Sequence, residues 1–209
     1  MVSPSLHDTT GQVRPVKIAM AQICALDGDR EGNFRRIENA IEEAQEKGAE
    51  IVTFPESCIL GWLNSQAHQR AYPIPGEDSD RLGALARKYN VHLSIGLDAK
   101  EGDKLYDTAL LLDNTGKIIL IHRKIHVLPE LMTPPYSVGE SVQVVETRFG
   151  KIGVLICADS FLDDLLTKMK AKHPDVLLIP YGWAADEWEW PDHGKELEQV
   201  VQNAARKVL

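Results

Sequence analysis

The chain contains 209 residues, of which 44% are hydrophobic and 26% are charged, so it can bury one sizeable core. Its formal net charge is −8 and it has no Lys/Arg-rich block, which argues against a nucleic-acid partner. No apolar run approaches the ~20 residues that span a bilayer, so a membrane partner is not expected either.

Residues 1–15 are polar, contain two prolines and are expected to form a flexible tail. They lack the basic segment followed by an apolar one that marks a signal peptide. The three cysteines, Cys24, Cys58 and Cys157, have no CxxC spacing, so neither a disulfide framework nor a zinc site is expected. These features indicate a cytoplasmic protein without a metal, in which Cys24 and Cys58 are small buried hydrophobic residues.

The first half of the chain predicts strands that alternate with helices. In chain order, the expected elements are a strand at 17–23, a helix around 34–44 that Gly48 ends, a strand at 50–54, a helix at 78–89 and a strand at 91–97.

The second half predicts two β-hairpins. Strands at 105–112 and 117–122 flank the turn sequence at 113–116, and strands at 142–147 and 152–156 flank residues 148–151. A helix at 162–172, a strand at 176–179 and a final helix are expected to follow. The apolar stripe of that helix consists of Leu197, Val200, Val201, Ala204, Ala205 and Val208. Because no linker or repeat interrupts this order, residues 16–209 are expected to form one α/β domain with layered sheets.

Three reactive side chains stand where predicted buried strands stop. Glu56 ends the run Ile51–Glu56, Lys124 ends a run that begins at Ile118, and Cys157 ends a run that begins at Ile152. Loops at strand ends are where α/β scaffolds usually hold their chemistry. A carboxylate, an ammonium and a thiol are the groups that nucleophilic acyl transfer needs.

The sequences around these residues resemble the nitrilase (carbon–nitrogen hydrolase) superfamily, whose catalytic residues are Glu, Lys and Cys in this chain order. The resemblance extends from about Val16 to the C-terminus. The matching motifs are Val16–Gln22, Phe54-Pro55-Glu56, Arg123-Lys124-Ile125-His126, Gly150–Cys157 and Asp175–Pro180.

The resemblance implies a four-layer αββα sandwich of the nitrilase type. Domains of that family continue beyond the helix that matches residues 196–208, through strands that complete the second sheet. We therefore expect this chain to be truncated at its C-terminus and its second sheet to be incomplete.

The resemblance also implies roles for individual residues. Cys157 is the expected nucleophile, Glu56 its general base, and Lys124 the cation that stabilises the oxyanion with the backbone N–H of Ala158. The alternative interpretation of Cys157 is a buried structural thiol. Glu130 is the nearest candidate for a second glutamate that would position substrate and hold Lys124. The expected pocket residues are Tyr181 and Trp183.

The reaction expected from this resemblance is hydrolysis of a non-peptide carbon–nitrogen bond through a Cys thioester, without a cofactor. Cys157 is followed by Ala158-Asp159, whereas Trp-Glu follows the nucleophile of true nitrilases, so a small-molecule amide or carbamoyl amide is favoured over a nitrile. An Asp two residues after the Cys resembles the amidase and carbamoylase branches, but the Arg and Pro-Glu that follow shortly after it in those branches are missing, so the subfamily stays open. Two alternatives stay open: a non-catalytic binding or scaffold protein of the same fold, and an acyltransferase that uses the same thioester.

A homodimer or larger homo-oligomer is expected as well. Family members pair through segments that follow the nucleophile, and the matching stretch here includes a helix with apolar residues on one face. Those residues are Leu162, Leu165, Leu166 and Met169, beside the loop Trp183–Trp190.

Overall fold

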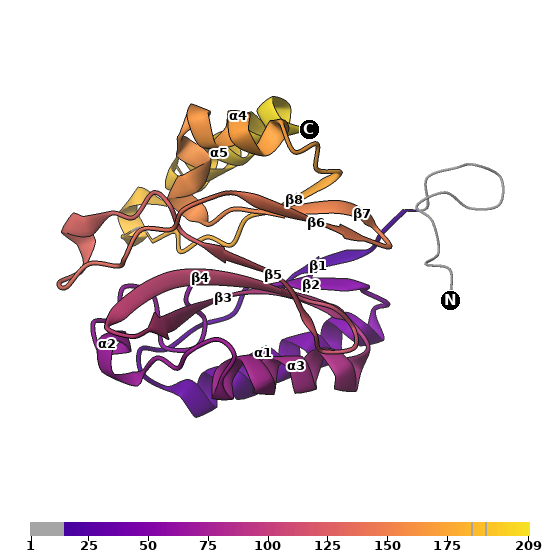
Figure 1. Ribbon diagram of the computed structural model, residues 1–209, viewed down its shortest axis with the longest axis horizontal. Coiled ribbons are helices and arrows are strands. Elements are labelled where there is room, and N and C mark those ends of the chain that lie inside the picture. Colours follow the sequence, from indigo (N-terminus) through magenta and orange to yellow (C-terminus); the bar gives the residue numbers. More distant parts are fainter. Residues whose placement is uncertain (1–14, 185, 191) are drawn as a thin grey trace.

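A computed structural model describes residues 15–184, 186–190 and 192–209, so almost all of the expected tail at 1–15 lies outside the described residues. The elements stack in four layers (Figure 1): one helical layer, a five-stranded sheet, a three-stranded sheet and a second helical layer. The expected four-layer αββα sandwich is therefore confirmed, with three strands in the second sheet.

The first sheet has the strand order β1-β2-β3-β4-β5. The strands are β1 (Ile18–Met20), β2 (Ile51–Thr53), β3 (His92–Glu101), β4 (Lys104–Leu112) and β5 (Ile118–Arg123). The first three run parallel, and β4 pairs antiparallel with both β3 and β5, which confirms the hairpin around residues 113–116. β3 continues four residues beyond the predicted end at Leu97, because the fold buries the carboxylate of Asp98 inside the sheet.

Helices α1 (Arg30–Glu46) and α3 (Glu77–Tyr89) cover the outer face of this sheet (Figure 1). The side chain of Asp29 caps α1 by accepting a hydrogen bond from the backbone N–H of Gly32. The buried residues recur at helical spacing, so each helix presents one apolar stripe to the sheet. They are Phe34, Ile37, Ile41 and Ala44 in α1 and Leu82 and Ala86 in α3.

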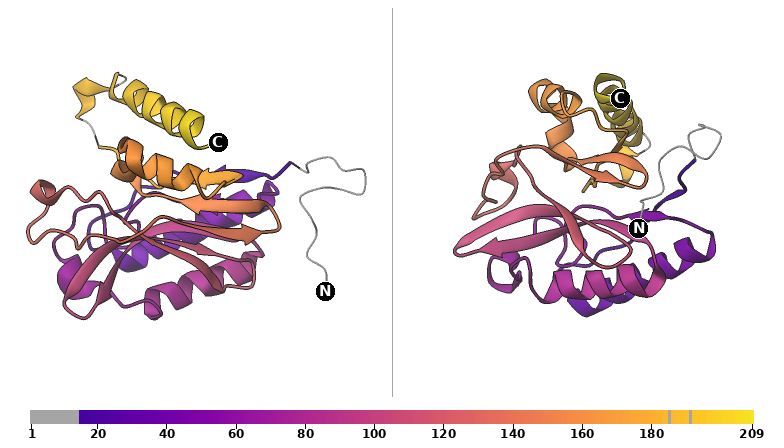
Figure 2. Two further views of the ribbon diagram at one scale, coloured as in Figure 1. Left: turned by 45° about the horizontal axis from the view of Figure 1, so that its top comes forward. Right: turned by 45° about the vertical axis from the view of Figure 1, so that its right-hand side comes forward.

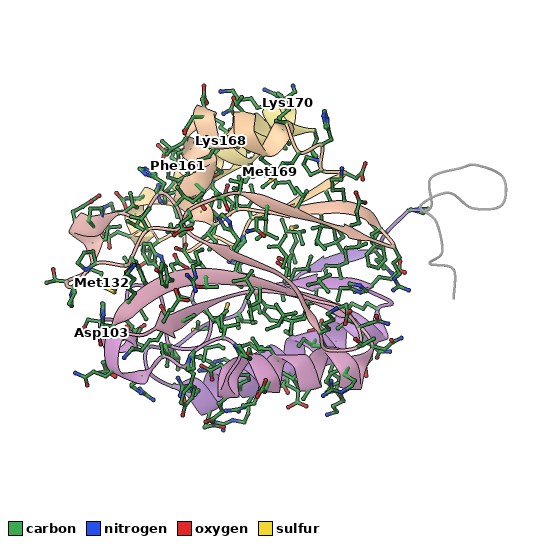
Figure 3. The ribbon with its side chains drawn as sticks, in the orientation of Figure 1. Asp103, Met132, Phe161, Lys168, Met169 and Lys170 are labelled. Atoms are coloured by element: carbon green, nitrogen blue, oxygen red, sulfur yellow. The ribbon has the colours of Figure 1, made fainter. Side chains whose placement is uncertain are left out.

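The second sheet has the order β6-β7-β8, from β6 (Gln143–Thr147), β7 (Gly150–Val154) and β8 (Val176–Leu178). β6 and β7 form the second expected hairpin, and β8 runs parallel to β7. Side chains fill the space between the two sheets (Figure 3). The residues that form this core include Ala109, Leu111, Leu120, Ile152, Val154 and Leu178.

The outer helices α4 (Asp163–Lys170) and α5 (Asp192–Val208) lie together on the second sheet (Figure 2). They bury Leu165, Leu166 and Met169 against Ala204 and Val208 of the same chain, so the apolar face predicted as a subunit interface is internal. The predicted stripe of α5 is only partly buried, because Val201 and Ala205 are exposed. The exposed large apolar side chains in this region include Phe161 (41%), Trp188 (80%) and Trp190 (60%).

Short helical segments complete the chain: α2 (Ala67–Arg70) and the 3₁₀ segments η1 (Pro129–Leu131), η2 (Cys157–Phe161) and η3 (Glu187–Glu189). Cys58 is buried as expected, but Cys24 is exposed, because β1 ends at Met20 and the chain then leaves the sheet. Among the helices of the described ranges, none combines the length and apolar character that crossing a membrane requires.

Candidate active site

The two sheets bring Glu56, Lys124 and Cys157 together at one end of the sandwich. Glu56 follows β2 and Lys124 follows β5, both in the first sheet, whereas Cys157 follows β7 in the second. Met132 and Phe161, which lie shortly after Lys124 and Cys157 in the chain, mark this end in Figure 3. All three reactive side chains are almost fully buried, with 3% of Glu56 and 4% each of Lys124 and Cys157 exposed.

Both oxygens of the Glu56 carboxylate are held in place. The Lys124 ammonium donates a short hydrogen bond to Oε1, and the backbone N–H of Gly182 donates to Oε2 at 2.7 Å. Gly182 lies beyond β8, so the second sheet contributes to the position of a carboxylate that belongs to the first. The carboxylate can therefore turn little, and its position relative to Cys157 depends on both sheets.

Cys157 occupies a sharp turn between β7 and η2. Its φ is +42°, in the left-handed region that a side chain with a Cβ rarely adopts. Two hydrogen bonds hold this conformation: the backbone N–H of Cys157 donates to the carbonyl of Pro180 at 2.9 Å, and Ser160 Oγ donates to the carbonyl of Cys157 at 2.7 Å. Strained backbone of this kind persists only where its surroundings impose it, and such positions cluster at functional sites.

Burial raises the pKa of the Cys157 thiol to about 12, and the negative charge of Glu56 adds to the shift. The Lys124 ammonium and the N–H of Gly182 act in the opposite direction but do not cancel it. The thiol is therefore protonated at neutral pH, and it needs a base at the moment of attack. Glu56, whose negative charge acts on the thiol, is the candidate acceptor of that proton.

Lys124 stays an ammonium in this environment. Burial lowers its pKa, but the neighbouring acidic side chains of Asp107 and Glu56 outweigh burial, and the net shift is upward. Asp107 Oδ2 lies 3.2 Å from Lys124 Nζ. A permanent cation beside the thiol can stabilise negative charge that develops on a substrate oxygen.

Asp159 ties the segment after Lys124 to the turn that carries Cys157. Its Oδ1 accepts hydrogen bonds from the backbone N–H groups of Ile125 at 2.9 Å and His126 at 2.7 Å. Its Oδ2 accepts from the N–H of Ile156 at 3.1 Å and lies 2.8 Å from Nε2 of the buried His122. In the sequence, Asp159 indicated only the subfamily, as the second residue after Cys157. No sequence pattern indicated that its side chain joins these two segments.

The structure does not bring Glu130 to this cluster. Glu130 is exposed on η1, and no hydrogen bond or ion pair between described residues joins it to Lys124. Asp107 lies beside the ammonium instead, as the second acidic partner of Lys124 after Glu56. Sequence reasoning missed Asp107, although a carboxylate inside the apolar run Leu105–Leu112 was a signal that it has a special environment.

The remaining predicted residues lie on the segments that follow β7 and β8. Ala158 is buried in the first turn of η2, where backbone N–H groups have no partner within the helix. Tyr181 packs against the core that contains Cys157, and its hydroxyl lies 2.8 Å from Ser160 Oγ. Trp183 stacks on His193 with ring centroids 4.5 Å apart. Within the described ranges, no group of three or more His, Cys, Asp or Glu residues could hold a metal ion.

Comparison with known proteins agrees with this arrangement at the level of the family. The model of the carbon-nitrogen hydrolase family matches residues 17–206, and the chain therefore belongs to that family. An amidase from Nesterenkonia sp. has a similar structure, with a TM-score of 0.76 and 25% sequence identity, over 84% of this chain and 68% of that one.

Plant nitrilases are among its curated relatives. The bifunctional nitrilase/nitrile hydratase NIT4B of Lupinus angustifolius and nitrilase 3 of Arabidopsis thaliana are each 30% identical to it over 196 residues. These alignments cover 83% of this chain but only 55% and 56% of the relatives, so the chain spans about half the length of the curated relatives it matches.

Proposed function

We propose that the protein hydrolyses a non-peptide carbon–nitrogen bond, with a small amide as its substrate, through a thioester on Cys157. The observation that carries the proposal is the burial of Glu56, Lys124 and Cys157 at the ends of β2, β5 and β7, with Glu56 bonded to Lys124 and its charge acting on the Cys157 thiol. A carboxylate between a thiol and an ammonium can accept the thiol proton and later return it.

In the proposed reaction, Glu56 removes the proton from Cys157 while the sulfur attacks the substrate carbonyl carbon. The Lys124 ammonium and the backbone N–H of Ala158 stabilise the oxyanion. Glu56 then gives the proton to the leaving ammonia or amine as the carbon–nitrogen bond breaks, which leaves a thioester. A water molecule, deprotonated by Glu56, attacks the thioester and releases the carboxylic acid and the thiol.

We favour an amide over a nitrile for two reasons. The nucleophile is followed by Ala158-Asp159 rather than by Trp-Glu. The similar structure from Nesterenkonia sp. is that of an amidase, although the curated relatives are nitrilases. Both kinds of substrate would form the same covalent bond to sulfur, so the preference has to be measured directly.

The test is ammonia release from matched pairs of substrates, such as propionamide and propionitrile, combined with intact-mass spectrometry. Turnover of the amide with an acyl adduct on Cys157 supports the proposal. Loss of both signals in Cys157→Ser, and their retention in Cys24→Ser, would assign them to this thiol, because Cys24 is the exposed cysteine. Turnover of the nitrile alone would contradict the substrate preference. The absence of both adduct and turnover would favour a binding protein, and faster acyl release with hydroxylamine would favour an acyltransferase.

A further inference from the structure

Three acidic side chains are buried at the site, and two of them contact its Lys124 ammonium. Besides Glu56, they are Asp98 on β3 and Asp107 on β4, which are 2% and 1% exposed. The register of the two strands places Asp98 directly opposite Asp107. The mechanism described above uses Glu56 and Lys124 but gives no task to this pair.

The pair cannot carry two negative charges at low cost. Like charges at directly opposite positions of two strands destabilise a sheet, and a buried charge needs a partner of its own. One Lys124 ammonium serves Glu56 and Asp107 together, so the positive charge does not balance three carboxylates. At least one proton therefore has to stay within the cluster.

The hydrogen bonds distinguish Asp98 from Asp107. Asp98 Oδ1 accepts from the Tyr136 hydroxyl at 2.6 Å and from the Ser57 hydroxyl at 3.5 Å, which stabilises negative charge on Asp98. Within the described residues, neither carboxyl oxygen of Asp107 has a partner with hydrogen-bond geometry, apart from the ionic contact to Lys124 at 3.2 Å. Asp107 therefore has fewer hydrogen-bond donors to stabilise a negative charge than Asp98 has.

We propose that Asp107 is a positioning residue that, as a neutral carboxyl group, holds the Lys124 ammonium and the Glu56 carboxylate in their reacting geometry. The inference rests on the function proposed above and extends it to a fourth buried group. A neutral Asp107 can accept an N–H of Lys124 with one oxygen and donate its proton toward Glu56 with the other. Burial first, and then the charge of Glu56, raise the pKa of Asp107 well above its usual range, in agreement with this arrangement.

The backbone geometry couples Asp107 to the position of Lys124 as well. The backbone N–H of Lys124 donates to the carbonyl of Asp107 at 2.9 Å. The two residues therefore touch through both main chain and side chain, and a change at Asp107 has a direct route to the ammonium. The titratable groups that face Asp107 from the elements packed around it are Glu56, Lys124 and Asp98, together with the Tyr136 hydroxyl.

The experiment compares Asp107→Asn, which keeps a neutral group of the same shape, with Asp107→Ala, which removes it. In a Cys24→Ser background, iodoacetamide alkylation of Cys157 is followed by peptide mass mapping between pH 6 and 10, and amide turnover is measured in parallel. We expect Asp107→Asn to keep the wild-type pH profile and rate. Asp107→Ala should shift the pH profile and lower turnover by ~10²-fold, the loss typical of a displacement of about 1 Å.

The matched control is Asp78→Asn. Like Asp107, Asp78 is a buried aspartate beside a basic side chain, here that of Arg30, but it lies on α3 outside the site. This variant should leave the alkylation profile unchanged, which separates positioning from a general loss of stability. A large rate loss in Asp107→Asn would overturn the proposal, because it would mean that the charge of Asp107 is needed. This result would test the proposal even if Asp107→Ala does not fold. An unchanged Asp107→Ala would also overturn it. If the wild-type protein hydrolysed no amide, the proposed function would fail, whereas the alkylation profiles would still test the role of Asp107.

Discussion

Gly96 lies where β3 passes close to the backbone of Glu56, and we expect its replacement by alanine to disable the proposed site without unfolding the protein. A Cβ at this position would lie 2.6 Å from Glu56 Cα, 2.7 Å from the carbonyl oxygen of Pro55 and 2.8 Å from the backbone nitrogen of Ser57. All three are main-chain atoms, so no side-chain rotation can relieve the contact. The segment that carries Glu56 has to move.

The size of the movement follows from these distances. Carbon atoms that are not bonded pack at about 3.5–4.0 Å, so the shortfall at Glu56 Cα is roughly 1 Å. A displacement of about 1 Å in a catalytic group can cost ~10²-fold in rate, and overpacking of this kind costs about 1–3 kcal/mol of stability. We therefore expect kcat for amide hydrolysis to fall ~10²-fold, while the thermal transition stays cooperative and shifts by only several degrees.

Gly83→Ala provides a matched control for this prediction. Its Cβ would lie 2.7 Å from the carbonyl oxygen of Gly116, another main-chain contact, but at the end of β5 away from Lys124. It should lower Tm to a similar extent and leave kcat unchanged. Equal kcat values for Gly96→Ala and wild-type protein, in a sample whose Tm has fallen, would refute the argument that Gly96 sets the position of Glu56.

Three further outcomes are expected. Lys124→Ala and Glu56→Gln should each lower amide turnover by at least ~10²-fold, as measured by ammonia release, because they remove the oxyanion cation and the general base; a nearly silent Lys124→Ala would be incompatible with the proposed mechanism. Burial raises the pKa of Asp98 to about 7, whereas an unfolded aspartate titrates near ~3.9, so the folded state binds this proton more tightly. Its contribution to stability is therefore present at low pH and is lost as pH rises through 7, by about 2 kcal/mol between pH 5 and pH 7. Urea unfolding should show a weaker pH dependence in Asp98→Asn, and identical slopes in the two proteins would contradict the shift. Asp159→Ala should destabilise the protein by roughly 3 kcal/mol or more in the same assay, because it leaves buried N–H groups of Ile125, His126 and Ile156 without an acceptor; a change as small as that of Asp163→Ala, at an exposed position on α4, would show that other acceptors replace it.

Much of the fold could be predicted because its signals are local. The turn residues at 113–116 and the apolar periodicity of α1 and α3 identify their elements without knowledge of the rest of the chain. The strand ends at Glu56, Lys124 and Cys157 could be found in the same way, because each reactive group follows a short, largely apolar run.

The parts that could not be predicted depend on contacts between segments far apart in sequence. Whether Leu165 and Met169 face solvent or α5 depends on where α5 packs, and the helix alone shows only that one face is apolar. Cys24 is exposed because the chain leaves the sheet after a strand of three residues, which hydrophobicity does not indicate. Asp107 and Asp98 look like ends or interruptions of strands until the register places them opposite each other and the fold places Asp107 beside Lys124.

The division of the candidate site between two sheets has a consequence for how activity depends on folding. Cys157 follows a strand of one sheet, Glu56 follows a strand of the other, and Asp159 and Gly182 bridge the two with hydrogen bonds. Neither sheet holds a reactive centre by itself, so the centre exists only while the apolar layer between them is closed. A partial opening along that layer would leave the strands and helices intact, but it would separate Cys157 from Glu56 and so abolish turnover. Turnover would then report on the docking of the two halves, and it should be lost before any signal from secondary structure changes.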